Sequence, residues 1–363
     1  MSKIRFEILP PIDRPGEPVF ITGNVGALGH WQPERGLKLA WNPPFHTGEI
    51  EADTGTHLEY KIVRGSWEKE AVDAHGNVPD NFVHDVWLDG TRRHTVADWK
   101  DRYRGRLTSE RIYSRVLAGE RDILIWLPQD YAAKPRQRFP LIVLHDGSNV
   151  FDPATSRVSG VDWAADEWVN LLSSHGFLPG AIVVGVCHPE GYAEENITLR
   201  DFELSPEMGA PAYAEFVATE LVGHMDTHYR TLATPSARVL AGAGLGAAAT
   251  LLVALRHPEA FGRIACLSTT FADLSQSPPE RAVLLNALEE LPDLPDKIRA
   301  YFDYGTRGAD AGAAPYHKRL GTLLRARGWR ENRHFLLRRV EGGGHDEISW
   351  RWRFGAALRF LMY

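Results

Sequence analysis

The chain has 363 residues, of which 44% are hydrophobic and 24% are charged, so it can form two globular domains and is neither disordered nor fibrous. Its formal net charge of -6 excludes a general electrostatic attraction to nucleic acid or to an anionic membrane. The first residues contain no apolar stretch of the signal-peptide type, and no run of about eighteen apolar residues predicts a membrane span. We therefore expect a cytoplasmic protein.

Residues 1–100 consist of short alternating segments separated by clusters of glycine, proline and aspartate, with no helical period. Alternation with a period of two is typical of half-buried strands, so this region predicts an all-β sandwich domain. The clearest predicted strands are residues 18–22, 58–63 and 83–88.

Three phrases in this region resemble the starch-binding family of carbohydrate-binding modules. They are Gly23-Asn-Val-Gly-Ala-Leu-Gly-His-Trp31, Leu58-Glu-Tyr-Lys61, and Gly65-Ser-Trp-Glu68 with the segment 77–81 that follows it. In that family aromatic rings lie flat against glucose units. The resemblance therefore implies an α-glucan as the ligand of this domain.

The same resemblance implies which side chains contact the sugar. It places Trp67 and Lys61 on the ligand side, and Phe45 is the nearest candidate for a second aromatic platform, with Trp41 slightly upstream. The alternative is that Trp31 and Trp67 fill the core of the sandwich.

The composition becomes charged and irregular at residues 101–106, which we interpret as a linker before a second domain of residues 107–363. The basic cluster Arg102, Arg104, Arg106, Arg111 and Arg115 is interpreted as part of a solvated connector. Beyond it, near-continuous apolar strands alternate with helical stretches, which predicts a mostly parallel sheet with helices on both faces. The predicted strands are residues 122–127, 141–144, 181–186, 238–241, 264–267, 299–302 and 335–339, with a helix over 164–172.

The segment from Arg238 to Thr250 is the most informative stretch, because an apolar strand breaks into glycines and then continues as a helix-forming run. It resembles the nucleophile elbow G-x-S-x-G of α/β-hydrolases, in which the serine occupies a sharp strand-to-helix turn. The matching positions run from Gly242 to Gly246, and Gly244 stands in the place of the serine.

A dinucleotide-binding fingerprint is the rival interpretation, because Gly242, Gly244 and Ala247 also fit G-x-G-x-x-G/A. That fingerprint requires an acidic residue about twenty positions on, at the end of the next strand. The next predicted strand ends in Ser268, Thr269 and Thr270, and two predicted strands precede the motif. We therefore favour the elbow.

Four phrases of the second domain, taken together, resemble an esterase family of α/β-hydrolases that contains enterochelin esterases, feruloyl esterases and mycolyltransferases. The resemblance covers about residues 106–363 and implies an α/β-hydrolase fold and hydrolysis of carboxylic esters by a Ser-His-Asp mechanism. The phrases are residues 145–152, 199–206, the elbow with 257–262 after it, and 342–350.

The resemblance also implies the catalytic residues. His345, in a glycine-rich loop after the last strand, is the predicted base, and Asp310 is the predicted acid, with Asp303 as the alternative. The predicted oxyanion donors are backbone N–H groups of Gly147, Ser148 and Leu245.

No other serine replaces the missing nucleophile, because Ser268 ends the next strand and Ser148 belongs to the oxyanion loop. Ala247 is a second departure from the family pattern at the same site, which favours natural loss of the serine over an engineered change. The chain is thus predicted to be a carboxylic-ester hydrolase of the enterochelin esterase-like type that lacks its nucleophile. It is either a pseudo-hydrolase or an inactive variant. The alternative is a non-catalytic carbohydrate-binding or scaffolding protein.

We expect neither a metal nor another cofactor. His224 and His228 are four residues apart, but no partner motif accompanies them. The expected partners are a small-molecule ester or a carbohydrate, with no nucleic acid and no membrane.

Overall fold

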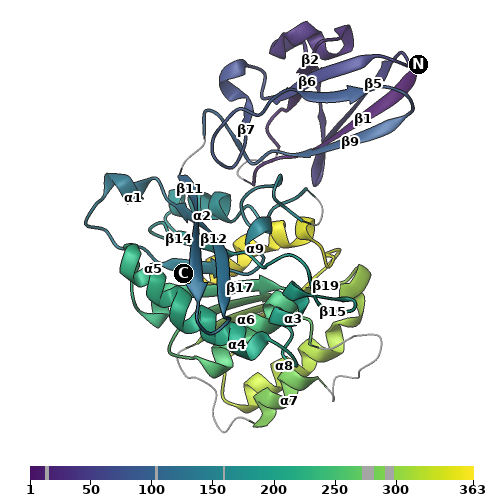
Figure 1. The fold of residues 1–363 in the computed structure, drawn as a ribbon. Helices are drawn as coiled ribbons and strands as arrows, with labels where there is room; N and C mark the ends of the chain where they lie inside the picture. The colour runs from purple at the N-terminus through teal and green to yellow at the C-terminus, as the bar shows by residue number, and fades with distance from the viewer. Residues whose placement is uncertain (13–15, 103–104, 158–159, 272–281, 291–297) are drawn as a thin grey trace.

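The computed structural model describes residues 1–12, 16–102, 105–157, 160–271, 282–290 and 298–363. Figure 1 shows an N-terminal β domain, purple to blue, above a larger α/β domain that runs from teal to yellow. No described helix is both long enough and apolar enough to cross a membrane.

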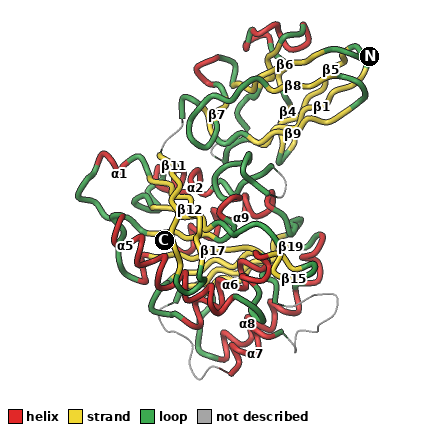
Figure 2. The backbone as a smooth tube through the Cα atoms, in the orientation of Figure 1, coloured by secondary structure: helices red, strands yellow, loops and turns green. Residues whose placement is uncertain are grey.

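The N-terminal domain is all-β, as the sequence predicts, and consists of two four-stranded sheets in the orders β4-β5-β1-β9 and β3-β2-β6-β8 (Figure 2). In β1, buried Ile4, Phe6 and Ile8 alternate with more exposed side chains, so one face of the strand enters the core between the sheets. The strands are β1 Ser2–Leu9, β2 Phe20–Gly23, β3 Leu37–Lys38, β4 Ala40–Asn42, β5 Phe45–Ala52, β6 His57–Val63, β7 Ala71–Val72, β8 Phe82–Asp85, β9 Gly90–Thr95 and β10 Asp98–Trp99.

The strand predicted over residues 83–88 is shorter in the structure, where β8 ends at Asp85. Val86 leaves the sheet because its backbone N–H and C=O pair with Thr56 and Gly55 instead. The two residues after it, Trp87 and Leu88, are exposed.

The second domain has the predicted α/β-hydrolase architecture, with one eight-stranded sheet in the order β11-β12-β14-β13-β17-β18-β19-β20. From β13 onward the neighbouring strands pair in parallel, and the four residues of β13 are all buried because helices cover both faces. The strands are β11 Arg106–Ser114, β12 Gly119–Leu127, β13 Leu141–Leu144, β14 Ile182–Val186, β17 Arg238–Ala243, β18 Arg263–Leu267, β19 Arg299–Gly305 and β20 Phe335–Val340, with a separate hairpin of β15 Tyr192–Glu194 and β16 Ile197–Thr198.

The interpretation of the basic cluster as a connector is wrong for Arg106 and Arg111, because both belong to edge strand β11. This strand pairs antiparallel with β12 along its whole length, and Arg111 forms an ion pair with Asp122 at 2.6 Å. Arg106 and Arg111 face solvent, as is usual at a sheet edge, whereas Glu110 contacts His224 and Tyr229.

Helices α2 and α9 cover the face of the sheet nearest the N-terminal domain, and α4, α5, α6 and α8 cover the opposite face (Figure 1). The helix predicted over residues 164–172 is α2. The helices are α1 Asp130–Ala133, α2 Ala165–Ser174, α3 Leu199–Leu204, α4 Ala210–Glu215, α5 Val222–His228, α6 Leu245–Arg256, α7 Val283–Glu290, α8 Ala314–Ala326 and α9 Glu347–Met362, and a π-helical segment Phe216–Leu221 joins α4 to α5.

A buried polar cluster joins the two domains. The guanidinium of Arg351, on α9, is fully buried and donates to Asp162 Oδ1 at 2.5 Å and to Glu167 Oε1 at 3.2 Å. It also donates to the Pro10 carbonyl at 3.3 Å, and Glu167 Oε2 accepts from the Ile12 N–H at 2.8 Å. The segment that leaves β1 is therefore held by side chains of the second domain.

Asp166 adds a further carboxylate to this cluster, and its Oδ1 is buried with no hydrogen-bond partner among the described residues. Burial, followed by the nearby charges of Asp162 and Asp98, raises the pKa of Asp166 well above its ordinary value. The folded chain therefore binds a proton here that the unfolded chain releases near pH 4, so this group costs stability as the pH rises above that value.

Replacing Asp166 with asparagine should raise the melting temperature by about 2–4 °C at pH 8 and change it little at pH 4. Thermal unfolding of both proteins across this pH range measures the effect. Asp130→Asn, on an exposed aspartate of α1 that pairs with Lys134, is the matched control and should show no such pH dependence. Equal shifts of Asp166→Asn at both pH values would contradict the account.

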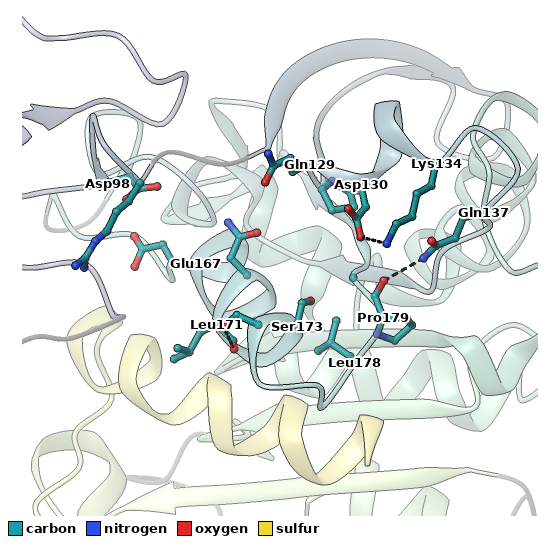
Figure 3. Close-up of a pocket in the computed structure, with 15 residues that line it drawn as sticks. Asp98, Gln129, Asp130, Lys134, Gln137, Glu167, Leu171, Ser173, Leu178 and Pro179 are labelled. Carbon is teal, nitrogen blue, oxygen red and sulfur yellow. Dashed lines mark hydrogen bonds and ion pairs between the residues drawn. The ribbon is translucent and has the colours of Figure 1, made fainter. Parts of the chain in front are cut away.

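A cleft of about 770 Å³ lies beside this cluster, between Asp98 and Arg102 of the N-terminal side and helices α1 and α2 (Figure 3). Its charged groups are engaged in the protein itself: Lys134 donates to Asp130 at 2.6 Å, and Glu167 belongs to the buried cluster. The predicted catalytic residues lie elsewhere.

Candidate active site

Gly244 lies at the sharp turn between β17 and α6, with φ of 57° and ψ of -120°. A residue with a Cβ is strained in this backbone region, whereas glycine adopts it readily. The turn is fixed by its own peptide groups, because the Gly244 N–H donates to the Leu267 carbonyl at 3.1 Å and its carbonyl accepts from Ala248 N–H at 3.2 Å.

Close packing requires glycine at position 242 and leaves room for only a small side chain at position 246. A Cβ at Gly242 would collide with the backbone of Gly246 one turn on, and a Cβ at Gly246 would lie 3.4 Å from the Cβ of His145. Small residues on both sides therefore let the strand turn directly into the helix, as the elbow resemblance implies.

His345 and Asp310 meet beside this turn. His345 Nδ1 is 2.8 Å from Asp310 Oδ1, and a Cβ built on Gly244 would lie 3.0 Å from His345 Nε2. The loop that carries His345 is fixed by the next residue, because Asp346 caps α9 by accepting from Ser349 N–H at 2.8 Å. A hydroxyl on that Cβ would thus lie next to Nε2 of His345, whose imidazole is oriented by Asp310 through its other nitrogen, Nδ1.

Asp310 is held as an anion. Its Oδ2 accepts from the Ser268 hydroxyl at 2.6 Å and from the Gly305 N–H at 2.7 Å. Burial works against the charge, but the hydrogen bonds from His345, Ser268 and Gly305 prevail and lower the pKa of Asp310 below its ordinary value. Asp310 is therefore ionised at neutral pH.

Asp303, the alternative acid, is not in contact with His345. It is fully buried on β19, where it pairs with Arg353 at 3.2 Å and accepts from the Tyr301 hydroxyl at 3.1 Å. Burial raises the pKa of Asp303 to about 6. The geometry therefore favours Asp310 over Asp303 as the partner of the imidazole.

Three residues around the acid were missed by the sequence analysis as parts of the site. Ser268 Oγ, which donates to Asp310, accepts from Trp350 Nε1 at 3.0 Å and from Arg353 Nη2 at 2.8 Å. The Trp350 ring also packs edge-on against His345, with 5.0 Å between ring centroids. Trp350 is the last residue of the phrase 342–350, so the family resemblance could have indicated it. Arg353 lies one helical turn further along α9, and no sequence pattern indicated it.

A cavity of about 640 Å³ opens in front of Gly244 and His345. Trp163, Tyr192 and Trp350 give its wall an aromatic part, and Leu245 lines it at the start of α6. Many of its other lining residues are polar or charged, and its volume falls within the range of small-molecule sites.

Asp146 and Arg200 form the polar wall of this cavity and bring two of the sequence phrases together. Arg200 Nη2 donates to Asp146 Oδ2 at 2.8 Å, and Arg200 Nε donates to the other oxygen. Although burial alone would raise it, the hydrogen bonds and charge of Arg200 lower the pKa of Asp146 to about 2. The pair therefore stays ionised across the physiological pH range.

The roles of the Gly147, Ser148 and Leu245 N–H groups as oxyanion donors stay a prediction. Leu245 lies beside Gly244 in the cavity wall, whereas the loop after β13 contributes Asp146 and Asn149 to that wall. The loop packs closely on β14, because an added Cβ at Gly147 would be 2.6 Å from the Gly185 backbone, and the Ser148 hydroxyl is 3.3 Å from the Asn149 side chain.

His145 supports the same loop from within the core. Its Nδ1 is 2.8 Å from the Tyr213 hydroxyl and its Nε2 is 3.1 Å from Thr250 Oγ1. Burial lowers the pKa of His145 to about 3, so the imidazole is neutral. It stabilises the fold around the elbow and does not face the cavity.

The predicted carbohydrate contacts do not all lie on one sheet. Trp67 begins a short helical turn after β6 and is 38% exposed, and Lys61 on β6 is engaged with the Pro79 carbonyl at 2.5 Å and Glu70 at 3.0 Å. Phe45 begins β5 in the other sheet, under the guanidinium of Arg93. Lys61 and Trp67 thus lie on or just after β6, whereas Phe45 belongs to the other sheet, and a sugar contact by any of them stays a prediction.

Within the described ranges, no three His, Cys, Asp or Glu side chains gather in a way that could hold a metal ion. His224 contacts Glu110 at 2.8 Å and stacks on His228.

Residues 114–361 match the sequence profile of the family described as "Putative esterase". The chain belongs to this esterase family. Residues 1–92 of the same chain match the family described as starch binding domain, so the esterase domain follows a starch-binding module.

Individual proteins are similar to different parts of this chain. The Bacillus subtilis protein YjcH is 28% identical over 207 residues, which are 57% of this chain and 75% of YjcH. An amylopullulanase of Thermoanaerobacter thermohydrosulfuricus is 29% identical over 102 residues, 28% of this chain and 7% of the amylopullulanase. The ferric enterobactin esterase of Salmonella typhimurium superposes with a TM-score of 0.55 over 95% of this chain and 88% of its own, at 16% identity, a likeness that concerns the fold alone.

Proposed function

We propose that the esterase domain is a serine-hydrolase site without its nucleophile, which binds a small ester in its cavity and does not form an acyl-enzyme. The observation that carries this proposal is the position of Gly244: its missing Cβ would lie 3.0 Å from His345 Nε2, and His345 is held by Asp310. Base and acid are thus arranged for an oxygen that the chain does not contain.

The chemistry of acyl transfer defines what is lost. A serine hydroxyl would give its proton to His345 Nε2 while its oxygen attacks the ester carbonyl, and Asp310 would stabilise the imidazolium that results. With glycine at position 244, no covalent bond to the acyl group can form there. Such sites keep only the roughly 10³–10⁴-fold acceleration due to ligand binding and the oxyanion donors.

The chain as it stands should bind an aromatic ester and leave it intact. Ethyl ferulate is a suitable probe, because the cavity wall combines Trp163, Tyr192 and Trp350 with the charged pair Asp146 and Arg200. Isothermal titration should show a single site, and chromatography of the same sample should recover the ester unchanged over the experiment.

Tyr192→Ala should weaken this binding about tenfold, because Tyr192 lines the cavity and is 73% exposed, so its removal does not disturb the core. Tyr113→Ala removes a tyrosine that is 66% exposed on β11 and should leave the binding unchanged. Rapid release of ferulate by the unmodified chain would contradict the proposal.

We further propose that the N-terminal domain binds α-glucans and delivers the esterase domain to them. The proposal rests on the starch-binding match of residues 1–92 and on the exposed ring of Trp67. A glucan-binding scaffold associated with glycogen is the alternative role, and it requires only this module.

Binding to amylose should fall about tenfold in Trp67→Ala, since stacking of the indole on glucose supplies most of the contact. Trp87→Ala is the matched control, because Trp87 is 67% exposed at the end of β8 and lies outside the phrases of the starch-binding resemblance. Retention on amylose resin measures both. If Trp87→Ala alone loses binding, or if the unmodified chain is not retained, the assignment of Trp67 is wrong.

A further inference from the structure

A second groove, of about 740 Å³, lies between helices α2 and α9 over strands β19 and β20. None of the residues that line this groove also lines the cavity in front of Gly244 and His345. Its walls are strongly apolar, with rings of Trp168, Phe177, Trp352 and Phe360.

Every charged side chain in this wall is basic. Arg299, Arg338 and Arg359 line the groove, and no Asp or Glu side chain is among its described lining residues. In the part of the chain that the structure describes, none of these three arginines forms an ion pair. A concentration of unpaired positive charge is notable on a chain whose net charge is -6.

Two of the three guanidinium groups, those of Arg299 and Arg359, lie over aromatic rings. Arg299 lies 4.3 Å from the ring centre of Phe360, and Arg359 lies 4.9 Å from that of Phe177. These contacts fix the arginines without neutralising them, so their hydrogen-bond donors stay available to an anion.

Two donors in this wall have no acceptor. Arg299 Nε and Trp352 Nε1 are buried, and neither has a hydrogen-bond partner among the described residues. Buried donors are nearly always satisfied in folded proteins, so an unpaired one destabilises the folded state. Because both atoms have almost no accessible surface, an acceptor in the groove pairs with them only when the side chain turns its donor toward the groove.

We propose that the groove between α2 and α9 binds a single-chain anionic amphiphile of the fatty-acid type. The carboxylate accepts from the arginines and from Trp352, and the hydrocarbon chain packs against the rings of the wall. The neutral polar side chains in this wall are few, namely His175, Tyr363 and the indoles of Trp168 and Trp352. Sugars and nucleotides, whose hydroxyl and base groups need many polar partners, are therefore poorly suited. Its volume falls within the roughly 300–1,000 Å³ of small-molecule sites.

Isothermal titration with decanoate below its micellar concentration tests this proposal. Decanoate should bind at one site, whereas decyltrimethylammonium, with the same chain and opposite charge, and acetate, with the head group alone, should bind at least tenfold more weakly. Equal binding of the two decyl compounds would overturn the anion requirement, and absence of decanoate binding would overturn the site.

The site is located by variants with matched controls. Arg338→Gln combined with Arg359→Gln removes two exposed charges and should raise the Kd of decanoate at least tenfold. Lys3→Gln combined with Arg111→Gln removes the same charge elsewhere on the surface and should leave the Kd unchanged. Trp352→Phe keeps the ring, removes the donor, and should weaken binding severalfold.

Two other outcomes would overturn the proposal. Loss of decanoate binding in Tyr192→Ala, with no loss in the arginine variant, would place the ligand in the catalytic cavity. Sedimentation of the unmodified chain as a dimer that the arginine variant dissociates would show that a second copy occupies the groove. The result is independent of whether the esterase site binds ethyl ferulate.

Discussion

Replacing Gly244 with serine should create esterase activity that a further change, His345→Ala, removes. The expected gain in hydrolysis of p-nitrophenyl acetate is at least about a hundredfold, a small part of the roughly 10⁶-fold that a complete triad supplies. The reason is geometric: a side chain at position 244 begins 3.0 Å from His345 Nε2, and His345 Nδ1 is 2.8 Å from Asp310. Initial rates of the purified variants measure the gain.

The same substitution should destabilise the protein. A residue with a Cβ at the φ of 57° and ψ of -120° of Gly244 costs about 1–3 kcal/mol of folding free energy. Gly244→Ala carries this strain without a hydroxyl, so both variants should unfold at lower temperature and only Gly244→Ser should turn over substrate. Unchanged stability in both variants would argue against a strained elbow at this position.

Replacing Arg351 with methionine should lower the free energy of unfolding by about 3–5 kcal/mol. Arg351 is the cation at the centre of the domain junction, and its loss leaves Asp162 and Glu167 buried without it. It also removes the hydrogen bond to the Pro10 carbonyl, which ties the N-terminal domain to α9. Urea denaturation, followed by tryptophan fluorescence, measures the loss.

The triple variant Arg351→Met, Asp162→Asn, Glu167→Gln should recover part of the lost stability, because it removes the unpaired charges as well. Arg325→Met is the surface control, since Arg325 pairs with Glu331 in an exposed ion pair and should cost less than about 1 kcal/mol. An Arg351→Met variant as stable as the unmodified chain would show that the junction does not depend on this cluster.

Much of the fold could be predicted because the inner strands are buried on both faces. The apolar run at residues 141–144 coincides with β13, and the glycine-rich turn after residues 238–241 coincides with the end of β17. Edge strand β11 could not be predicted in this way. It contains two arginines and a glutamate among few apolar residues, and only its pairing with β12 identifies it as a strand.

The site was less accessible to sequence reasoning. The phrases indicated His345 and Asp310, but Asp303 also follows the apolar part of β19, and only the structure distinguishes the two by their contacts. Ser268 and Arg353 were missed because they are 85 residues apart and meet only when β18 and α9 pack together. Phe45 was chosen from its sequence position, which does not reveal that β5 and β6 belong to different sheets.

Labelling with a fluorophosphonate probe tests the account of the elbow most directly. Gly244→Ser should be modified stoichiometrically at position 244, as mapped by mass spectrometry, and Gly244→Ser with His345→Ala should react far more slowly. The unmodified chain should remain unlabelled throughout the esterase domain. A stoichiometric adduct on any serine of the unmodified chain, or a folded Gly244→Ser that takes up no label, would contradict the assignment of this site.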